Sequence, residues 1–312
     1  LFEARLNKIA TVRADLVLLY PDGKQHPKDT IKWLNPRQIS KHYHIRWNLD
    51  GDFERLARFV AGKAVGLCLG GGGARGFAHF GVIKTLEEAG IPIDIIGGNS
   101  IGAYVSSIYA TGYGKGWDIK TMIKATSKVF SRWHYHLTPP ITSMFADGIL
   151  VHDIKECMGG DTQIEDLWIP FFCVSSNLTR AEVKTHRTGP LWRAVRVSGG
   201  LPAVVPPVVF DGDLHVDGAL LNNLPIDVMS EMCDGGTVIA IDVSPIVDMG
   251  ENESHGDTLS GFDMLNSMYN PFADEIKMPS LPTIMQRSAE IGAVLQLKGI
   301  VEKLTDVYIS MP

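Results

Sequence analysis

Between residues 64 and 113 the order of apolar runs, glycine-rich turns and amphipathic stretches restricts the fold more than any other feature. The run AVGLCLG passes into four consecutive glycines and then into FAHFGVIKTLEEAG, and the run IDIIGG passes into SIGAYVSSIYATG. Strands that alternate with helices are joined by right-handed crossovers and pair in parallel, with both faces of the sheet covered. The sequence therefore predicts an α/β fold with three layers, α/β/α, and a mainly parallel central sheet.

The rest of the pattern divides the chain into a lead-in segment and one large domain. Residues 1–62 are mixed and polar, with a strand expected in VRADLVLLYPDG and a helix in DGDFERLARFVAGK that Asp52 could cap. We expect this segment to pack on the larger domain, which covers residues 63–312. Further strands are predicted in WIPFFCVSSN, AEVKTHR, PPVVFDG and GTVIAIDVSP, and a helix in LPTIMQRSAEIGAVLQLKGIVEKL.

Composition restricts the class of protein. Of 312 residues, 45% are hydrophobic and 21% charged, which is typical of a globular protein, and the net charge of -6 argues against a general nucleic-acid binder. Every apolar stretch is interrupted before about 18 residues, so none is expected to span a membrane. The scattered cysteines, Cys68, Cys157, Cys173 and Cys233, are expected to be reduced. A chain that begins with Leu1 rather than Met is consistent with a piece of a longer protein.

The second glycine turn carries a candidate nucleophile, Ser100. Gly98-Asn99-Ser100-Ile101-Gly102 matches G-x-S-x-G and lies between a predicted strand and a predicted helix. In this setting the flanking glycines permit a strained turn that exposes the serine oxygen at the carboxyl edge of the sheet, with a helix N-terminus behind it. A serine between glycines also occurs in ordinary loops, but a second glycine-rich turn at the same edge favours the nucleophile.

The first glycine turn has two interpretations. Its residues 71–76 fit G-x-G-x-x-G, which binds a dinucleotide when an acidic residue ends the next strand. Here the nearest acid, Asp94, begins that strand, so we favour the second interpretation, in which main-chain amides hold an oxyanion that forms during a reaction. The amides expected to do this are those of Gly71, Gly72 and Gly73. Arg75 either positions the loop, contacts charge on a substrate or is solvated.

A serine nucleophile needs a base, and the sequence offers an aspartate. The histidine that follows Asp217 is His255, in the polar stretch ENESHGDT, which is a poor place for a rigid base. Asp217 ends an apolar run in LHVDGALLNNLP, and burial beside a serine would make such a carboxylate a stronger base. An aspartate before glycine can also be a simple turn residue. Asp213-x-His215-x-Asp217 does not complete a calcium loop, because Leu224 stands where a glutamate is required, and we predict no metal and no cofactor.

A basic amphipathic helix is expected after residue 118. Lys120, Lys124, Lys128 and Arg132 recur every four residues, which places them along one helix face, with apolar residues mainly on another. Such a helix indicates either a docking surface for anionic membrane or a solvated face over a packed one.

Together, GGGGARG, GNSIG and DGA resemble motifs of the patatin-like phospholipase family, whose members use a Ser–Asp dyad without histidine. By this resemblance the glycines from Gly70 to Gly73 match the oxyanion loop, Ser100 the nucleophile and Asp217 its partner. Longer stretches, including TGPLWRAVRVS and VIAIDVSP, look like the neuropathy target esterase type of lysophospholipase over about residues 30–245. Asn99 stands where that branch more often has Thr, and Ala219 replaces the second glycine of D-G-G. Neither change removes a reacting group.

The resemblance implies a patatin-like fold and a serine esterase. Its substrates would be phospholipids or lysophospholipids such as lysophosphatidylcholine, hydrolysed to fatty acid through an acyl-enzyme. The resemblance also implies a membrane surface as partner, with an upstream membrane anchor and cyclic-nucleotide-binding-like domains, on the cytosolic face of the endoplasmic reticulum. The alternatives are a triacylglycerol lipase or broad acyl hydrolase of the same family, and a catalytically idle lipid-binding domain. The stretch LPAVVPPVVFDGDLH is unusual for the branch, which affects acyl-chain specificity rather than the reaction.

Overall fold

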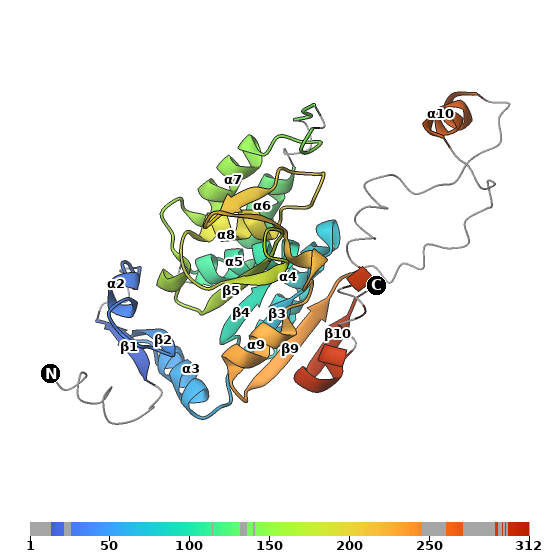
Figure 1. Ribbon diagram of the computed structural model, residues 1–312. Coiled ribbons are helices and arrows are strands. Elements are labelled where there is room, and N and C mark those ends of the chain that lie inside the picture. Colours follow the sequence, from blue (N-terminus) through green and yellow to red (C-terminus); the bar gives the residue numbers. More distant parts are fainter. Residues whose placement is uncertain are drawn as a thin grey trace.

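Among the described residues, the central sheet has eight strands (Figure 1). This computed structural model describes residues 14–21, 26–113, 115–131, 136–139, 141–244, 260–270 and most of 291–311. The strands are β3 (Val65–Leu69), β4 (Ile95–Gly98), β5 (Phe171–Asn177), β6 (Glu182–His186), β7 (Val208–Phe210), β8 (Asp213–Asp217), β9 (Thr237–Asp242) and β10 (Val307–Ser310). Their order is β10-β9-β3-β4-β5-β8-β7, with β6 paired to β5. The pairs from β10 to β5 are parallel and those of β6, β7 and β8 antiparallel, which confirms the mainly parallel sheet.

Helices cover both faces of this sheet, so the three predicted layers are confirmed. One face packs against α4 (Ala78–Glu88), α5 (Ile101–Tyr113), α6 (Ile119–Phe130), α7 (Gly148–Met158) and α8 (Leu191–Ser198). The other packs against α9 (Ile226–Cys233) and α3 (Asp50–Val60). Neighbouring strand residues alternate between the two cores, with Leu67 and Leu69 in the first and Cys68 in the second. All four cysteines are free, as expected.

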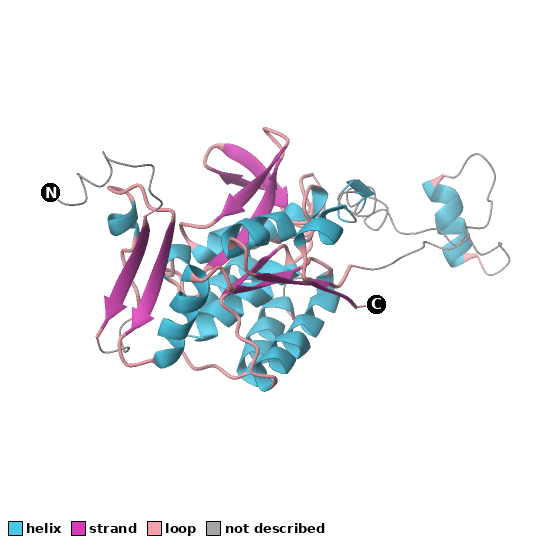
Figure 2. Cartoon of the chain, turned by 90° about the horizontal axis from the view of Figure 1, so that it is seen from below, coloured by secondary structure: helices cyan, strands magenta, loops and turns pink. Residues whose placement is uncertain are grey.

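The N-terminal strands form a separate parallel pair, β1 (Asp15–Tyr20) and β2 (Lys41–Arg46), with the short helix α2 (Ile31–Leu34) between them in the chain. Figure 2 shows this pair to one side of the main sheet. The pair contacts the larger part of the chain through His42 and His44, whose Nε2 atoms lie 3.0 and 2.9 Å from the carbonyl oxygen of Glu165. The sequence predicted β1 but not β2, and the division of the chain after residue 62 stays a prediction.

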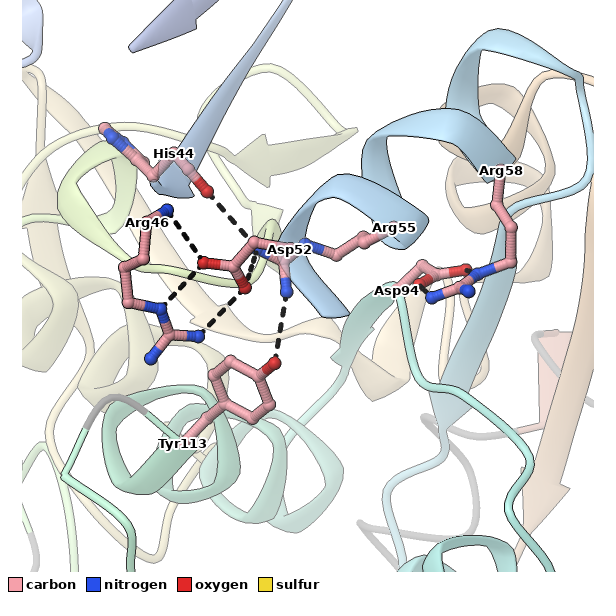
Figure 3. A network of polar contacts seen from close by, with 7 residues as sticks. All are labelled: His44, Arg46, Asp52, Arg55, Arg58, Asp94 and Tyr113. Carbon is pink, nitrogen blue, oxygen red and sulfur yellow. Dashed lines mark hydrogen bonds and ion pairs between the residues drawn. The ribbon is translucent and has the colours of Figure 1, made fainter. Parts of the chain in front are cut away.

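Asp52 does not cap α3, so this prediction was wrong. The N-cap residue is Leu49, which makes no side-chain capping bond, and Asp52 lies inside the first turn. Its carboxylate is buried and accepts a hydrogen bond of 2.7 Å from Arg46 Nε, while Arg55 Nη2 lies 2.9 Å from its other oxygen (Figure 3). A buried carboxylate needs charged partners. One of them comes from β2, which the local pattern around the helix start could not show.

The C-terminal part of the described chain closes one edge of the sheet. The described residues between 291 and 304 are helical, in line with the second half of the predicted helix at 281–304. β10 follows and pairs with β9, and the sequence did not predict it. A further helix, α10 (Gly261–Tyr269), begins with a capping box formed by Ser260 and Asp263. Across the described ranges, every helix is too short or too polar to cross a bilayer.

Candidate active site

Ser100 lies at a sharp turn between β4 and α5, as the G-x-S-x-G motif predicted. Its φ angle is +52°, in the left-handed region that a residue with a side chain seldom adopts. Such strain persists only where the surrounding structure enforces it, and it is typical of functional sites. The N–H of the preceding residue, Asn99, donates to the Leu69 carbonyl at the end of β3, over 3.1 Å. The turn therefore presents the half-buried serine at the carboxyl edge of the sheet.

The glycines on either side of the turn are required by the end of β3. A Cβ atom added to Gly98 or to Gly102 would collide with the carbonyl oxygen of Leu69. The turn can therefore lie this close to β3 only because both residues lack a side chain.

The glycine-rich loop follows β3 and lies beside the serine. A Cβ atom on Gly71 would be 3.1 Å from the Cβ atom of Ser100. The N–H groups of Gly70 and Gly71 donate to the carbonyls of Ile241 and Asn223, over 2.9 and 3.2 Å. Within the described part of the chain, the N–H groups of Gly72 and Gly73 donate to no acceptor.

These bonds give the four loop glycines different roles. Gly70 and Gly71, which were expected to supply amides to an oxyanion, use them to fix the loop to the fold. Among the described residues, the N–H groups of Gly72 and Gly73 are not used in this way. Gly73 has a φ angle of +59°, which suits glycine, and begins the 3-10 helix η1 (Gly73–Phe77).

His79 supports the same loop and was not predicted. Its Nε2 lies 2.9 Å from the Gly70 carbonyl oxygen, from the start of α4. Burial lowers the pKa of His79 to about 4, and its bond to Gly70 opposes that shift only in part. At neutral pH the ring is therefore uncharged and donates one N–H to the loop. Its place six residues after Gly73 was the only sequence signal.

Asp217 ends β8 on the same edge of the sheet and is fully buried. Its Oδ1 accepts hydrogen bonds of 2.8 Å from Asn99 Nδ2 and from the backbone N–H of Ala219. Because Asn99 directly precedes Ser100, the predicted aspartate and the predicted serine are joined through one intervening side chain. The structure thus brings together the glycine loop, the serine turn and Asp217. The bond between Asn99 and Asp217 alone joins residues 118 positions apart.

An apolar pocket of about 260 Å³ opens onto Ser100 and Gly73. Its walls come from η1, α5, α6, α7 and α8 and from the loop after α8, and include Phe77, Tyr104, Phe130, Leu150, Ile154 and Val204. A pocket of this lining fits a hydrocarbon chain. The candidate nucleophile and an apolar surface therefore meet at one point.

Comparison with known proteins agrees with this geometry. The sequence profile of the patatin-like phospholipases matches residues 67–230. The chain belongs to the patatin-like phospholipase family. It is 37% identical to the neuropathy target esterase sws of Drosophila melanogaster over 347 residues, covering 100% of this chain and 24% of that protein. It is 36% identical to the human patatin-like phospholipase domain-containing protein 6 over 333 residues, covering 95% of this chain and 24% of that protein.

This patatin-like chain thus spans about a quarter of the length of those relatives. A crystal structure of VipD from Legionella pneumophila is also similar, with a TM-score of 0.40 and 15% identity over 78% of this chain and 67% of that one. A similarity of that size supports no inference about function.

The acidic residue that a dinucleotide site at the glycine loop would require is engaged in another contact. Asp94 precedes β4 and is held by Arg58, whose Nε and Nη2 donate to its two oxygens over 2.8 and 2.7 Å (Figure 3). This aspartate fixes α3 to the sheet and lies at the opposite end of β4 from Ser100.

The basic helix forms as predicted, but its apolar face is packed. Met122, Thr126 and Val129 of α6 are buried. Lys120 and Lys124 are exposed, whereas Lys128 forms an ion pair of 2.7 Å with Glu156 of α7. Arg132 lies outside the described residues. Arg75 is exposed on η1, at the rim of the glycine loop.

Among the residues that the structure describes, one group of side chains has the spacing to hold a metal ion, and it lies on α7. His152, Asp153 and Glu156 place their ligand atoms within 4.8 Å of one another. Glu156 is already paired with Lys128, and an ammonium group there opposes a cation. His255, which sequence analysis set aside as a base, lies outside the described residues.

Proposed function

We propose that this chain is a serine esterase that hydrolyses the acyl ester bond of lysophospholipids such as lysophosphatidylcholine, and releases a fatty acid. The observation that carries the proposal is the strained Ser100 at the mouth of an apolar pocket, with Asp217 and the glycine loop beside it. The family and the names of the relatives, which include a phospholipase and an esterase, support a lipid ester as the substrate class.

In the proposed first step, Ser100 Oγ attacks the ester carbonyl carbon and its proton passes to Asp217. The carbonyl oxygen becomes an oxyanion, which the N–H groups of Gly72 and Gly73 stabilise, and each such donor contributes about 3 kcal/mol to transition-state binding. Collapse of this intermediate breaks the ester bond. The glycerol alcohol leaves with the proton from Asp217, and the acyl group stays on Ser100.

In the second step, water replaces the alcohol. Asp217 takes a proton from the water as it attacks the acyl-enzyme, and returns that proton to Ser100 as the fatty acid leaves. The acyl chain remains in the apolar pocket during both steps, so binding energy from the chain holds the ester at the serine. No metal or cofactor takes part in this scheme.

The proposal extends to where the reaction takes place. The resemblance to neuropathy target esterases implies a membrane-bound substrate at the endoplasmic reticulum, reached from the cytosol, with further domains upstream in the whole protein. On this chain, the exposed Lys120 and Lys124 supply charge for an anionic surface, and Arg75 lies near enough to the glycine loop to meet a lipid headgroup.

The direct test uses an activated phosphonate ester with the chain and its Ser100→Ala variant. We expect a phosphonate adduct on Ser100 by mass spectrometry, and lysophosphatidylcholine hydrolysis that the variant loses. Ser40→Ala, which removes an exposed serine near β2, serves as the control and should retain both. If the chain hydrolyses triacylglycerol faster than lysophosphatidylcholine, the result would favour a triacylglycerol lipase. If the chain folds but gives no adduct and no turnover, the result would favour a catalytically idle lipid-binding domain.

A further inference from the structure

Asn99 occupies the centre of the polar contacts behind the candidate nucleophile. Its side chain is fully buried between the ends of β4 and β8. Its Nδ2 donates to Asp217 Oδ1 over 2.8 Å and to Asn223 Oδ1 over 3.1 Å. Its Oδ1 accepts from Ser198 Oγ over 3.2 Å. All three polar positions of this amide are used by residues of other elements.

The direction of each proton in this network follows from the chemistry of the groups. The backbone N–H of Ser100 donates to Ser198 Oγ over 3.0 Å, so the Ser198 hydroxyl directs its own proton to Asn99 Oδ1. This assigns the oxygen of the amide to the Ser198 side and the NH2 group to the side of Asp217. Two N–H donors therefore face two oxygen acceptors, and no other orientation of the amide satisfies all three contacts.

The second proton of Asn99 connects the network to the glycine loop. Its acceptor, Asn223, donates from Nδ2 to the Gly71 carbonyl over 3.1 Å and to Ser244 Oγ over 2.9 Å. Asn223 also accepts the Gly71 N–H on its own carbonyl. Asn223 thus links the glycine loop to the same amide group that joins the serine turn to the aspartate strand.

We infer that Asn99 is a positioning residue that holds Asp217 and the glycine loop in register with Ser100; this inference rests on the proposed function. The amide can do so because it has two N–H donors and one acceptor, whereas a threonine side chain has a single O–H to donate. Gly218 leaves the space that the Asn99 side chain occupies, since a Cβ atom at position 218 would collide with Asn99 Oδ1.

The test compares three substitutions at one position. Asn99→Asp places a second carboxylate against Asp217 and should lower kcat about 100-fold, with little change in KM, since like charges displace the base. Asn99→Thr keeps one hydrogen-bond donor, and its kcat should be about tenfold lower than that of the wild type. Asn99→Leu keeps the side-chain volume without any donor, and its loss of kcat should lie between those of the other two variants. The rate of phosphonate addition to Ser100 should follow the same order.

Asn177→Asp is the matched control. Asn177 is also a buried asparagine whose Nδ2 donates to an aspartate over 2.9 Å, but that aspartate is Asp213, at the opposite end of β8 from Asp217. It should change Tm without changing kcat of the folded protein. Wild-type kcat in all three Asn99 variants, or an equal loss in all three that follows Tm alone, would overturn the inference.

Two further variants keep the inference testable. If Asn99→Asp does not fold, Ser198→Ala removes the hydroxyl that orients the amide, and a few-fold loss of kcat at constant KM is expected, whereas unchanged kcat refutes the positioning role. Ser100→Ala separates this inference from the proposed function. An active Ser100→Ala variant would refute the function itself, whereas an inactive one combined with fully active Asn99 variants would refute the role of Asn99 alone.

Discussion

Two aspartates of this molecule, Asp52 and Asp217, are equally buried but held by opposite means. Both side chains have no exposed surface. Asp52 is held by two guanidinium groups, those of Arg46 and Arg55, at 2.7 and 2.9 Å (Figure 3). The Oδ1 atom of Asp217 is held by two neutral amides, those of Asn99 and Ala219, each at 2.8 Å. The difference lies in the charge of the donors.

The charge of the donors decides what each carboxylate can do. Burial alone would raise the pKa of Asp52, but the hydrogen bond from Arg46 and the charge of Arg55 outweigh it and lower the pKa. A carboxylate stabilised in this way is a poor proton acceptor and serves to join α3 to β2. Neutral amides orient a carboxylate through hydrogen bonds and place no full positive charge beside it. We therefore expect one aspartate to matter for stability and the other for turnover.

The largest effect should follow from Asp217→Asn. Loss of the base is expected to lower kcat about 10⁴-fold, because Ser100 then has no group to take its proton. Tm should change by only a few degrees, since the amide keeps the shape of the carboxylate. Steady-state hydrolysis of a soluble ester and a thermal melt measure both. A variant with near wild-type turnover would remove Asp217 from the reaction.

Asp52→Asn should have the opposite effect, a large loss of stability with little change in turnover. Removing one partner of a buried ion pair typically costs about 3–5 kcal/mol of unfolding free energy, because Arg46 and Arg55 lose their counter-charge. Chemical denaturation measures the loss, with Asp50→Asn, an exposed residue of the same helix, as control. Turnover of the fraction that remains folded should be unchanged. A stable but inactive Asp52→Asn variant would contradict the division of roles.

Acidification should test both regions together, because both contain histidines that are buried in the uncharged form. Burial lowers the pKa of His44, beside the Asp52 network, and of His79, under the glycine loop, to about 4, and that of His186 to about 3. Their unfolded value is 6.5, so the unfolded chain binds more protons between pH 6.5 and 4. The stability they contribute is complete above pH 6.5 and is lost as pH falls.

At pH 5 each of these histidines should lower the free energy of unfolding by about 1–2 kcal/mol relative to pH 7. Denaturation at both pH values, with wild type and His44→Gln, checks the sign and the size. The variant should lose less stability on acidification than the wild type does. A stability that rises between pH 7 and 5 would show that these rings carry charge in the folded protein.

The smallest effect concerns the surface. Lys124→Gln removes one charge and should weaken binding to anionic vesicles roughly fivefold, at about 1 kcal/mol per charge, with no change in hydrolysis of a soluble ester. Sedimentation with vesicles of phosphatidylserine and phosphatidylcholine measures binding, and Lys84→Gln on the exposed surface of α4 provides the control. An equal loss in the two variants would mean that the net charge of the molecule, and not α6, governs attraction to the membrane.

The two aspartates also show how far sequence could be followed to structure. The serine turn and the glycine loop were predictable because each depends on a strand, a turn and a helix that are contiguous in the chain. Asp52 was misassigned as a cap because its partner Arg46 comes from a strand that the sequence did not reveal. Asp217 was predicted as a candidate base from its turn and by resemblance, but its bond to Asn99, which joins residues 118 positions apart, was not predicted. Long-range pairs of this kind, such as the pair of β10 with β9, produce no recognisable pattern in the sequence of either segment.

The contact of the Leu69 carbonyl with Gly98 and Gly102 has a consequence for protein engineering. The pentapeptide that carries the serine is not a portable module, because its geometry is shared with the last residue of a strand about thirty positions earlier in the chain. A graft of this serine turn into another α/β scaffold would have to include the end of β3 and the sheet spacing that comes with it. For the same reason, directed evolution should find almost no tolerated side chain at either glycine, even in variants selected for a different substrate.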